Sequence, residues 1–216
     1  MRLVITGVFL CCFNLNAEAL LNSRRSITSQ WRSNYFVLVE RETTSSKAVS
    51  VYLATKQKGK LFRLVRLETN RLEWGKDDKL TVSGNQIVIL LKGAADRYEH
   101  YHVLRKGSTY KLLNKPKGAT FGGSSVAVLW GYILGTMWVS PDYSESPGNY
   151  LYVFGRGGLR FGKLPGSQEG YEVRRLDSHR FQLQKWNTSN SNVSLTNHRF
   201  PFAMKNGQWI LPGLAR

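Results

Sequence analysis

Short apolar stretches alternate with turn-forming residues along this chain, and the alternation predicts antiparallel β-structure. β-branched and aromatic residues recur in brief runs, and glycine turns such as Lys58-Gly59 and Lys106-Gly107 separate several of them. No stretch repeats apolar residues at helical spacing. The predicted strands are residues 35–40, 48–54, 60–68, 86–92, 98–105 and 109–114, followed by 150–154, 170–176, 179–186 and 208–211. Strands that follow strands predict an all-β fold class, an antiparallel sandwich or barrel.

The N-terminal residues have the three parts of a secretory signal peptide. Arg2 precedes an uncharged apolar run over residues 3–15, and Ala17-Glu18-Ala19 places small residues at the two positions that signal peptidase reads. The run is shorter than the roughly 18 to 20 residues that a membrane-spanning helix needs. We therefore expect a cleaved signal peptide over residues 1–19, a mature chain that starts at Leu20, and a secreted or periplasmic location.

The remaining chain is strongly basic and contains neither cysteine. The protein has 31 Lys and Arg against 14 Asp and Glu, a net charge of +17 at pH 7. Residues 20–117 contain 20 basic and 8 acidic residues, and residues 118–216 contain 10 and 5. A charge excess of this size attracts polyanions, so it predicts an anionic polymer or membrane surface as partner, although no motif specific for nucleic acid occurs. We divide the mature chain where the charge changes, into a basic β-rich part, 20–117, and a second β-rich part, 118–216.

One heptapeptide recurs in the two parts. Residues 66–72, RLETNRL, match residues 175–181, RLDSHRF, with three identities and four conservative pairs. One interpretation is an internal duplication that gives two similar β-units, 35–114 and 126–211. The alternative is a chance similarity, because the heptapeptide is typical of many strand ends that lead into a turn.

An uncharged segment follows the boundary between the two parts. Residues 118–141 carry no charge, and most positions from 126 to 139 are apolar. Apolar residues occur at both odd and even positions, which is typical of a strand buried on both faces. A buried central strand is therefore the preferred interpretation. The alternative is a membrane-active segment over 118–139, since Gly131 and Gly135 have the spacing of small residues in paired membrane helices.

Catalytic motifs are scarce in the sequence. The only ligand-like spacing is that of His100 and His102, which a strand would place on one face, as a metal site requires. Exposed polar residues on a half-buried strand are the alternative. No P-loop, no Gly-x-Ser-x-Gly elbow and no His-Glu-x-x-His motif occurs. We predict no cofactor, and an enzyme is not the favoured class.

Basic residues cluster at three places that we predict to bind a polyanion. The first cluster surrounds the Lys58-Gly59 turn and comprises Lys56, Lys58, Lys60 and Arg63. The second comprises Arg105, Lys106, Lys111, Lys115 and Lys117. The third is a glycine-rich loop whose backbone N–H groups can approach an anion, with Arg156, Arg160 and Lys163. In a regular strand over 60–68, Lys60 and Arg66 would share one face and Arg63 would lie on the other.

These features predict an exported, non-enzymatic binding or interaction module for an anionic surface or polymer, such as a cell-envelope component, glycan or lipid. Two alternatives stand beside it. One is a membrane-active or host-directed secreted factor that uses residues 118–139, and the other is a metal-dependent enzyme that uses His100 and His102.

Overall fold

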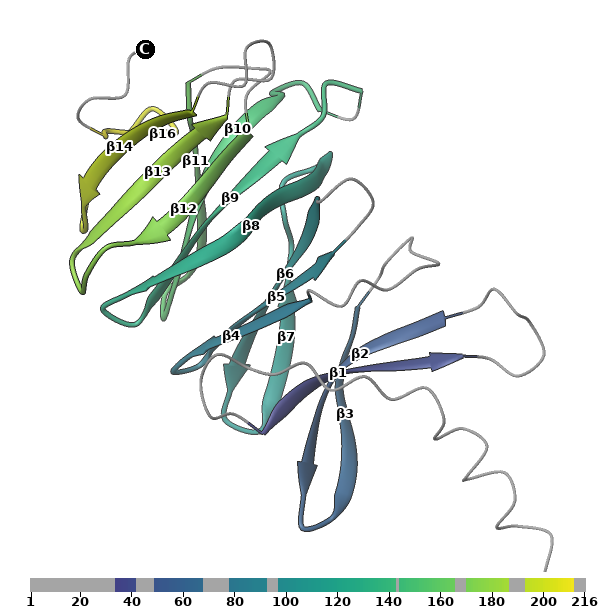
Figure 1. Cartoon of the computed structure of the whole chain (residues 1–216). Coiled ribbons are helices and arrows are strands. Elements are labelled where there is room, and N and C mark those ends of the chain that lie inside the picture. Colours follow the sequence, from purple (N-terminus) through teal and green to yellow (C-terminus); the bar gives the residue numbers. More distant parts are fainter. Residues whose placement is uncertain are drawn as a thin grey trace, which may run out of the picture. The chain divides into compact units, whose positions relative to one another are not determined.

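The computed structural model describes residues 34–41, 49–67, 78–92, 97–142, 144–165, 170–186 and 193–211 (Figure 1). All regular structure in these ranges is β-strand, which confirms the predicted all-β class. The described residues accordingly include no helix long and apolar enough to cross a membrane. The predicted signal peptide lies outside the described residues.

The strands form two compact units, which are described separately. Unit 1 contains β1 (Tyr35–Arg41), β2 (Val49–Gln57) and β3 (Lys60–Leu67), and unit 2 contains β4 to β16. The predicted boundary between residues 117 and 118 lies between β7 and β8, which belong to one sheet of unit 2. The two compact units divide earlier, between β3 and β4. The division at residue 117, which rests on charge, stays a prediction.

Unit 1 is a three-stranded antiparallel sheet in the order β1-β2-β3. The predicted turn between β2 and β3 is confirmed. Lys58 and Gly59 have φ values of 48° and 78°, the left-handed conformation that both central residues of a type I′ hairpin turn adopt. Val37, Val51, Leu53 and Leu67 are buried.

Unit 2 consists of two sheets. The larger runs in the order β15-β16-β11-β10-β9-β8-β6-β5-β4, and β7 also pairs with β6. Its strands are β4 (Lys79–Ser83), β5 (Gln86–Lys92), β6 (Tyr98–Lys106), β7 (Thr109–Leu113), β8 (Ala119–Leu129), β9 (Tyr132–Val139), β10 (Gly148–Gly155), β11 (Gly158–Lys163), β15 (Met204–Lys205) and β16 (Gln208–Trp209). The smaller sheet is antiparallel and contains β12 (Gly170–Arg175), β13 (Arg180–Trp186) and β14 (Val193–Arg199).

Strand β10 separates two hydrophobic cores. Leu151 and Val153 enter a core shared with β12 and β13, whereas Tyr152 and Phe154 point to the opposite face and enter a core shared with β5 and β6. Successive residues of a strand point to opposite faces, so both faces of the sheet are covered at this point. The larger sheet must also curve, because Val88 of β5 shares a core with Tyr152 although three strands separate β5 from β10 in the sheet. The arrangement is compatible with a sandwich.

The uncharged segment 118–139 forms two strands and not one. Trp130 and Gly131 make a hairpin turn, with φ values of 48° and 79°, between β8 and β9. Both strands are central in the larger sheet, and β9 is buried along most of its length. The central position of the segment is confirmed, and its burial is confirmed for β9, whereas β8 is mostly half-buried and the turn between them is exposed.

The two proposed repeats differ in how their corresponding strands pair. At the spacing of the repeated heptapeptide, β3 corresponds to β12, and β2 corresponds to β11. Strands β2 and β3 pair with each other, whereas β11 and β12 belong to different sheets. The second heptapeptide forms the turn between β12 and β13, and most of the first lies outside the described residues.

Candidate anion-binding surfaces and the buried histidine pair

The hairpin formed by β2 and β3 concentrates basic residues without acidic ones. We call residues 49–67 the basic hairpin. It has no Asp or Glu, and its five bases are all exposed: Lys56, Lys58, Lys60, Arg63 and Arg66. Phe62 is also exposed, at 44%. The first predicted polyanion cluster is therefore accessible to solvent.

A bulge in β3 changes which bases share a face. The cross-strand register shifts from Leu53 opposite Val65 to Ala54 opposite Arg63, which leaves Leu64 without a partner. Directly opposed residues share a face of the sheet. Arg63, opposite Ala54, and Arg66, opposite Tyr52, therefore lie on the same face, since Tyr52 and Ala54 are two residues apart.

The position of one side chain agrees with this arrangement. The Arg63 guanidinium lies 5.8 Å from the centre of the Tyr52 ring. Lys56, two residues beyond Ala54, shares the face of Arg63 and Arg66, whereas Lys60, opposite Gln57, lies on the other face. The expectation that Lys60 and Arg66 share a face was wrong, because it assumed a regular strand.

The structure disperses the second predicted cluster. Arg105 and Lys106 lie at the end of β6, and Lys111 is exposed on β7. Lys115 and Lys117 follow β7, beyond the opposite end of that strand. These five bases therefore do not form one surface.

Lys115 is half-buried and contacts an aromatic ring. Its ammonium group lies 5.2 Å from the centre of the Tyr101 ring, and the Tyr101 hydroxyl donates to Glu99 Oε2 over 2.6 Å. Burial lowers the pKa of Lys115, and the Glu99 carboxylate partly opposes that shift. A half-buried lysine held by an aromatic ring is poorly placed to follow a flexible polymer.

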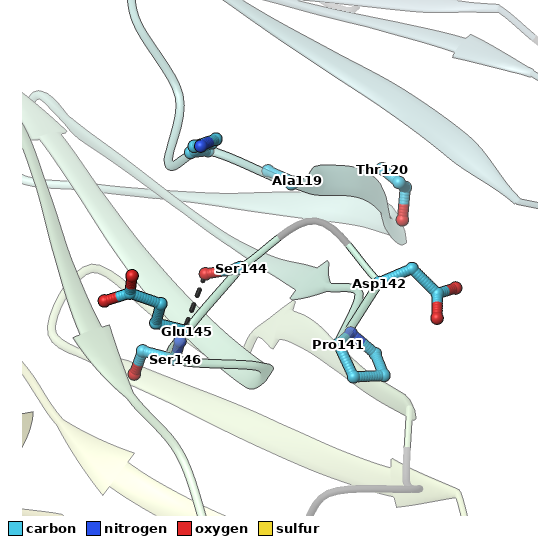
Figure 2. A pocket seen from close by; sticks show the side chains of 9 residues that line it. Ala119, Thr120, Pro141, Asp142, Ser144, Glu145 and Ser146 are labelled. Atoms are coloured by element: carbon cyan, nitrogen blue, oxygen red, sulfur yellow. Dashed lines mark hydrogen bonds between the residues drawn. The ribbon is translucent and has the colours of Figure 1, made fainter.

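Lys117 lines an open cleft of about 1050 Å³ at the start of β8 (Figure 2). The opposite wall is the connection between β9 and β10, where Asp142 and Glu145 lie. Ser140 Oγ donates to Asp142 Oδ2 over 3.2 Å. A polyanion that approached Lys117 would also meet the two carboxylates, so the cleft has mixed electrostatics.

The third predicted cluster is a turn and a strand. Arg156 and Gly157 form the turn after β10, and residues 158–163 form β11, paired along its length with β10. Residues 158–163 therefore form a strand and not the expected loop, and their contact with an anion stays a prediction. Arg156 and Arg160 are exposed, and Lys163 lies at the far end of β11.

Five hairpin turns gather at one end of unit 2, which we call the tip end. They connect β4 to β5, β6 to β7, β8 to β9, β10 to β11, and β12 to β13 (Figure 1). Gln86 joins three of them: with its amide oriented to match its neighbours, it donates to Ser83 O and Gly131 O and accepts from the Arg156 backbone N–H. The Arg105 N–H donates to Asn85 O over 2.8 Å, which adds the end of β6.

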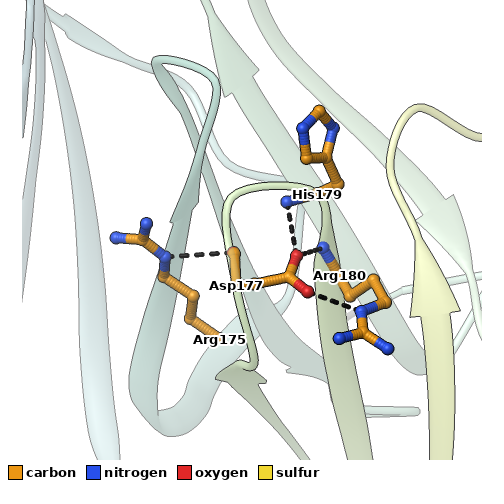
Figure 3. A network of polar contacts seen from close by, with 4 residues as sticks. All are labelled: Arg175, Asp177, His179 and Arg180. Carbon is orange, nitrogen blue, oxygen red and sulfur yellow. Dashed lines mark hydrogen bonds and ion pairs between the residues drawn. The ribbon is translucent and has the colours of Figure 1, made fainter.

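The turn between β12 and β13 contacts the turn between β8 and β9 through two aromatic rings. The Trp130 and His179 rings lie edge to face, with their centres 4.4 Å apart. Asp177 orders the turn itself, since its Oδ1 accepts from the backbone N–H groups of His179 and Arg180, each over 2.8 Å (Figure 3). These contacts lower the pKa of Asp177 to about 2. The hydrogen bond from the His179 backbone N–H contributes most, and the bond from the Arg180 side chain contributes next. Arg175 Nε donates to the Asp177 carbonyl over 3.1 Å.

Trp130 adopts an uncommon backbone conformation for its size. Its φ of 48° is left-handed, a region where L-residues other than Gly, Asn and Asp cost on the order of 1 kcal/mol. The side chain is nevertheless 58% exposed. Burial in the core of unit 2 therefore does not explain a tryptophan at this turn.

The structure places His100 and His102 together on one face of β6, as the spacing predicted. Their ring centres are 6.5 Å apart, and both rings contact Tyr152. Each side chain is only 1% exposed, so the alternative of exposed polar residues is wrong. The pair lies in the core between β6 and β10.

His100 is fully hydrogen-bonded as a neutral ring. Its Nε2 lies 2.8 Å from Gly123 O, which can only accept, so Nε2 carries the proton. Its Nδ1 then accepts from the Tyr152 hydroxyl over 3.0 Å. Gly122 and Gly135 leave room for this hydrogen-bonded pair. A Cβ at Gly122 would collide with the His100 ring, and a Cβ at Gly135 would collide with the Tyr152 hydroxyl.

His102 has no such partners. Neither of its ring nitrogens forms a hydrogen bond within the described residues. Its ring stands edge to face with Tyr152 at 4.4 Å and with Phe154 at 5.8 Å. Burial lowers the pKa of His100 to about 4. Burial also lowers the pKa of His102 well below its usual value, and the nearby His100 adds to that shift.

This geometry bears on the metal hypothesis. Both nitrogens of His100 are engaged by protein groups, so a metal ion would have to displace one of them. Among the described residues, no three His, Cys, Asp or Glu side chains converge as a metal site. The metal role of His100 and His102 stays a prediction.

Comparison of the sequence with protein-family models and with curated proteins finds no match.

Proposed function

We propose that this chain is an exported, non-enzymatic binding module for an anionic surface or polymer, and that the basic hairpin is its main contact. The observation that supports the proposal is the exposure of five bases on residues 49–67 without any acidic residue. Such a surface attracts a polyanion by releasing the counterions condensed on it.

The bulge in β3 sharpens the proposed contact. It directs Lys56, Arg63 and Arg66 to one face, and Lys58 lies in the turn that closes the same hairpin. The Tyr52 ring beneath Arg63 supports that guanidinium through a cation–π contact. A linear polymer lying along this face meets several cations in succession, whereas Lys60 on the other face adds to the general attraction.

The test is the salt dependence of binding to a sulfated polysaccharide. We expect the triple variant Lys56→Gln, Lys58→Gln, Arg63→Gln to reduce the slope of log affinity against log salt by about 2 to 3, because three fewer contacts release counterions. Affinity should fall with it. Isothermal titration calorimetry over a range of salt concentrations gives both quantities.

A matched control removes the same charge elsewhere. Lys92, Lys185 and Lys205 lie on β5, β13 and β15, outside the predicted clusters, so their triple replacement by Gln should lower affinity only through the loss of long-range attraction. Equal changes in slope for the two triple variants would show diffuse attraction and would overturn the proposed contact. Binding without any salt dependence would overturn the function itself.

A further inference from the structure

The tip end of unit 2 exposes large apolar side chains at its turns. Trp130 is 58% exposed in a left-handed turn position, and Leu176, in the adjoining turn, is 42% exposed. Tyr132, two residues after Trp130, is 39% exposed, and the centre of its ring lies 5.1 Å from that of Phe200. Two adjoining turns therefore expose three large apolar side chains.

Basic residues lie at the same end of unit 2. The bases at the turns or at the strand ends beside them are Arg105, Lys106, Arg156, Arg175, Arg180 and Arg199. All six are exposed. Arg180 pairs with Asp177, and Arg105 and Arg175 donate to backbone carbonyl oxygens of their own turns.

All but one of the acidic residues in the described part of unit 2 lie away from the tip end. Asp177 is at the tip end, whereas Glu172 lies beside Ser124 within the sheets. The others are at the opposite ends of the strands: Asp78 before β4, Glu99 near the start of β6, and Asp142 and Glu145 after β9. The tip end therefore combines exposed apolar side chains with a surplus of positive charge.

We propose that the tip end is a docking surface for a lipid bilayer with anionic headgroups. Trp130 and Leu176 enter the interfacial layer, where tryptophan is preferred because its ring is apolar and its N–H is polar. The surrounding arginines contact lipid phosphates, which they can bind through two N–H groups at once. A bilayer explains the exposed apolar groups, which a soluble polyanion does not require.

The unusual backbone of Trp130 supports the same conclusion. A type I′ turn favours Asn, Asp or Gly at this position, and strain retained at an exposed site points to a role outside folding. This surface belongs to unit 2 and uses none of the basic hairpin, so the inference is independent of the proposed polymer contact.

The test measures binding of the full chain to vesicles of phosphatidylcholine with about 30% phosphatidylglycerol, a lipid fraction that gives a strongly negative surface. The variant Trp130→Asn removes the ring and leaves a residue that the turn prefers, so a folding defect is not expected. We expect sedimentation to show about tenfold weaker binding, as for the loss of one interfacial anchor. Quenching of tryptophan fluorescence by brominated lipid should also decrease.

Leu195→Asn is the matched control, because Leu195 is 55% exposed on β14, away from these turns. It should leave vesicle binding unchanged. All variants are compared in the same chain, so the apolar N-terminal run contributes equally to each. The paired replacement of Lys106 and Arg156 by Gln should weaken binding to anionic vesicles and not to pure phosphatidylcholine.

Three results would overturn the inference. One is equal loss of vesicle binding by Trp130→Asn and Leu195→Asn, which would mean that no localised contact exists. Another is unchanged lipid quenching in Trp130→Asn. The third is weaker binding of Trp130→Asn to a soluble sulfated polysaccharide with vesicle binding intact, which would assign the tip end to a polymer.

Discussion

The basic hairpin of unit 1 and strand β6 of unit 2 both carry closely spaced basic side chains, and they place them in opposite environments. On the hairpin, Lys56 and Lys58 are exposed to water, which stabilises the charged form. On β6, His100 and His102 are each 1% exposed, and both rings contact Tyr152 in the core. Burial there favours the neutral ring.

This difference separates the conditions to which each region responds. An exposed cation changes its interactions with salt concentration, because mobile ions screen it. A buried neutral histidine changes with pH, because proton binding places a charge where water cannot solvate it. We therefore expect salt to act on binding through the hairpin and acid to act on stability through β6.

The largest expected effect is a loss of stability in acid. The pKa of His100 is about 4 in the folded chain and 6.5 when exposed, so the unfolded chain binds more protons between these values. Stability is complete above pH 6.5 and decreases as the pH falls toward 4, by about 3 kcal/mol for this one group. His102 acts in the same direction.

Urea unfolding at a series of pH values, followed by circular dichroism, measures this loss. Asp177 acts in the same direction but mainly below pH 4, because its pKa is about 2 in the folded chain and 3.8 when free. The triple Gln variant of the basic hairpin should show the same pH profile as the parent. A flat profile between pH 7 and 4 would contradict the assignment of the neutral pair.

Removal of the Tyr152 hydroxyl should have the next largest effect. Tyr152→Phe leaves Nδ1 of His100 buried without a donor, which costs about 2 kcal/mol of unfolding free energy. Tyr150→Phe is the matched control on the same strand, since that hydroxyl donates to Ser146 O at an exposed position. Equal costs for the two variants in urea unfolding would show that the His100 bond is not stabilising.

Replacement of His102 should have the smallest effect, with the opposite sign. His102→Phe removes two buried nitrogens that lack partners and retains a ring against Tyr152, so we expect a gain of about 1 kcal/mol at pH 7. The acid-induced loss should also become smaller. His179→Phe, at a half-exposed position, serves as control. Destabilisation by His102→Phe would indicate that the His102 nitrogens have a partner.

Local sequence was sufficient to predict much of the fold. Strands bounded by glycine turns, such as β2, β3, β5 and β6, were predicted within a few residues, because turn chemistry is read from adjacent positions. Strand β11 was missed because its glycines resemble a loop. Strand β14 was missed because it lies at the edge of its sheet, where most of its side chains remain exposed and polar.

The candidate surfaces were also predicted only in part from the sequence. The basic character of residues 56–66 follows from composition alone. The sharing of one face by Arg63 and Arg66 does not, because it depends on a bulge that the register with β2 creates. Likewise, the spacing of His100 and His102 placed both on one face, but nothing in the sequence near them predicted that they would be buried.

The sequence by itself determined the class of structure, the charge of the surface and the positions of most turns, since these depend on residues close together in the chain. Tertiary structure decided which side chains act together. Gly123 and Tyr152 satisfy His100 from other strands, and Trp130 meets His179 across two sheets. Such contacts join residues far apart in sequence, and only the pairing and packing of whole strands can place them side by side.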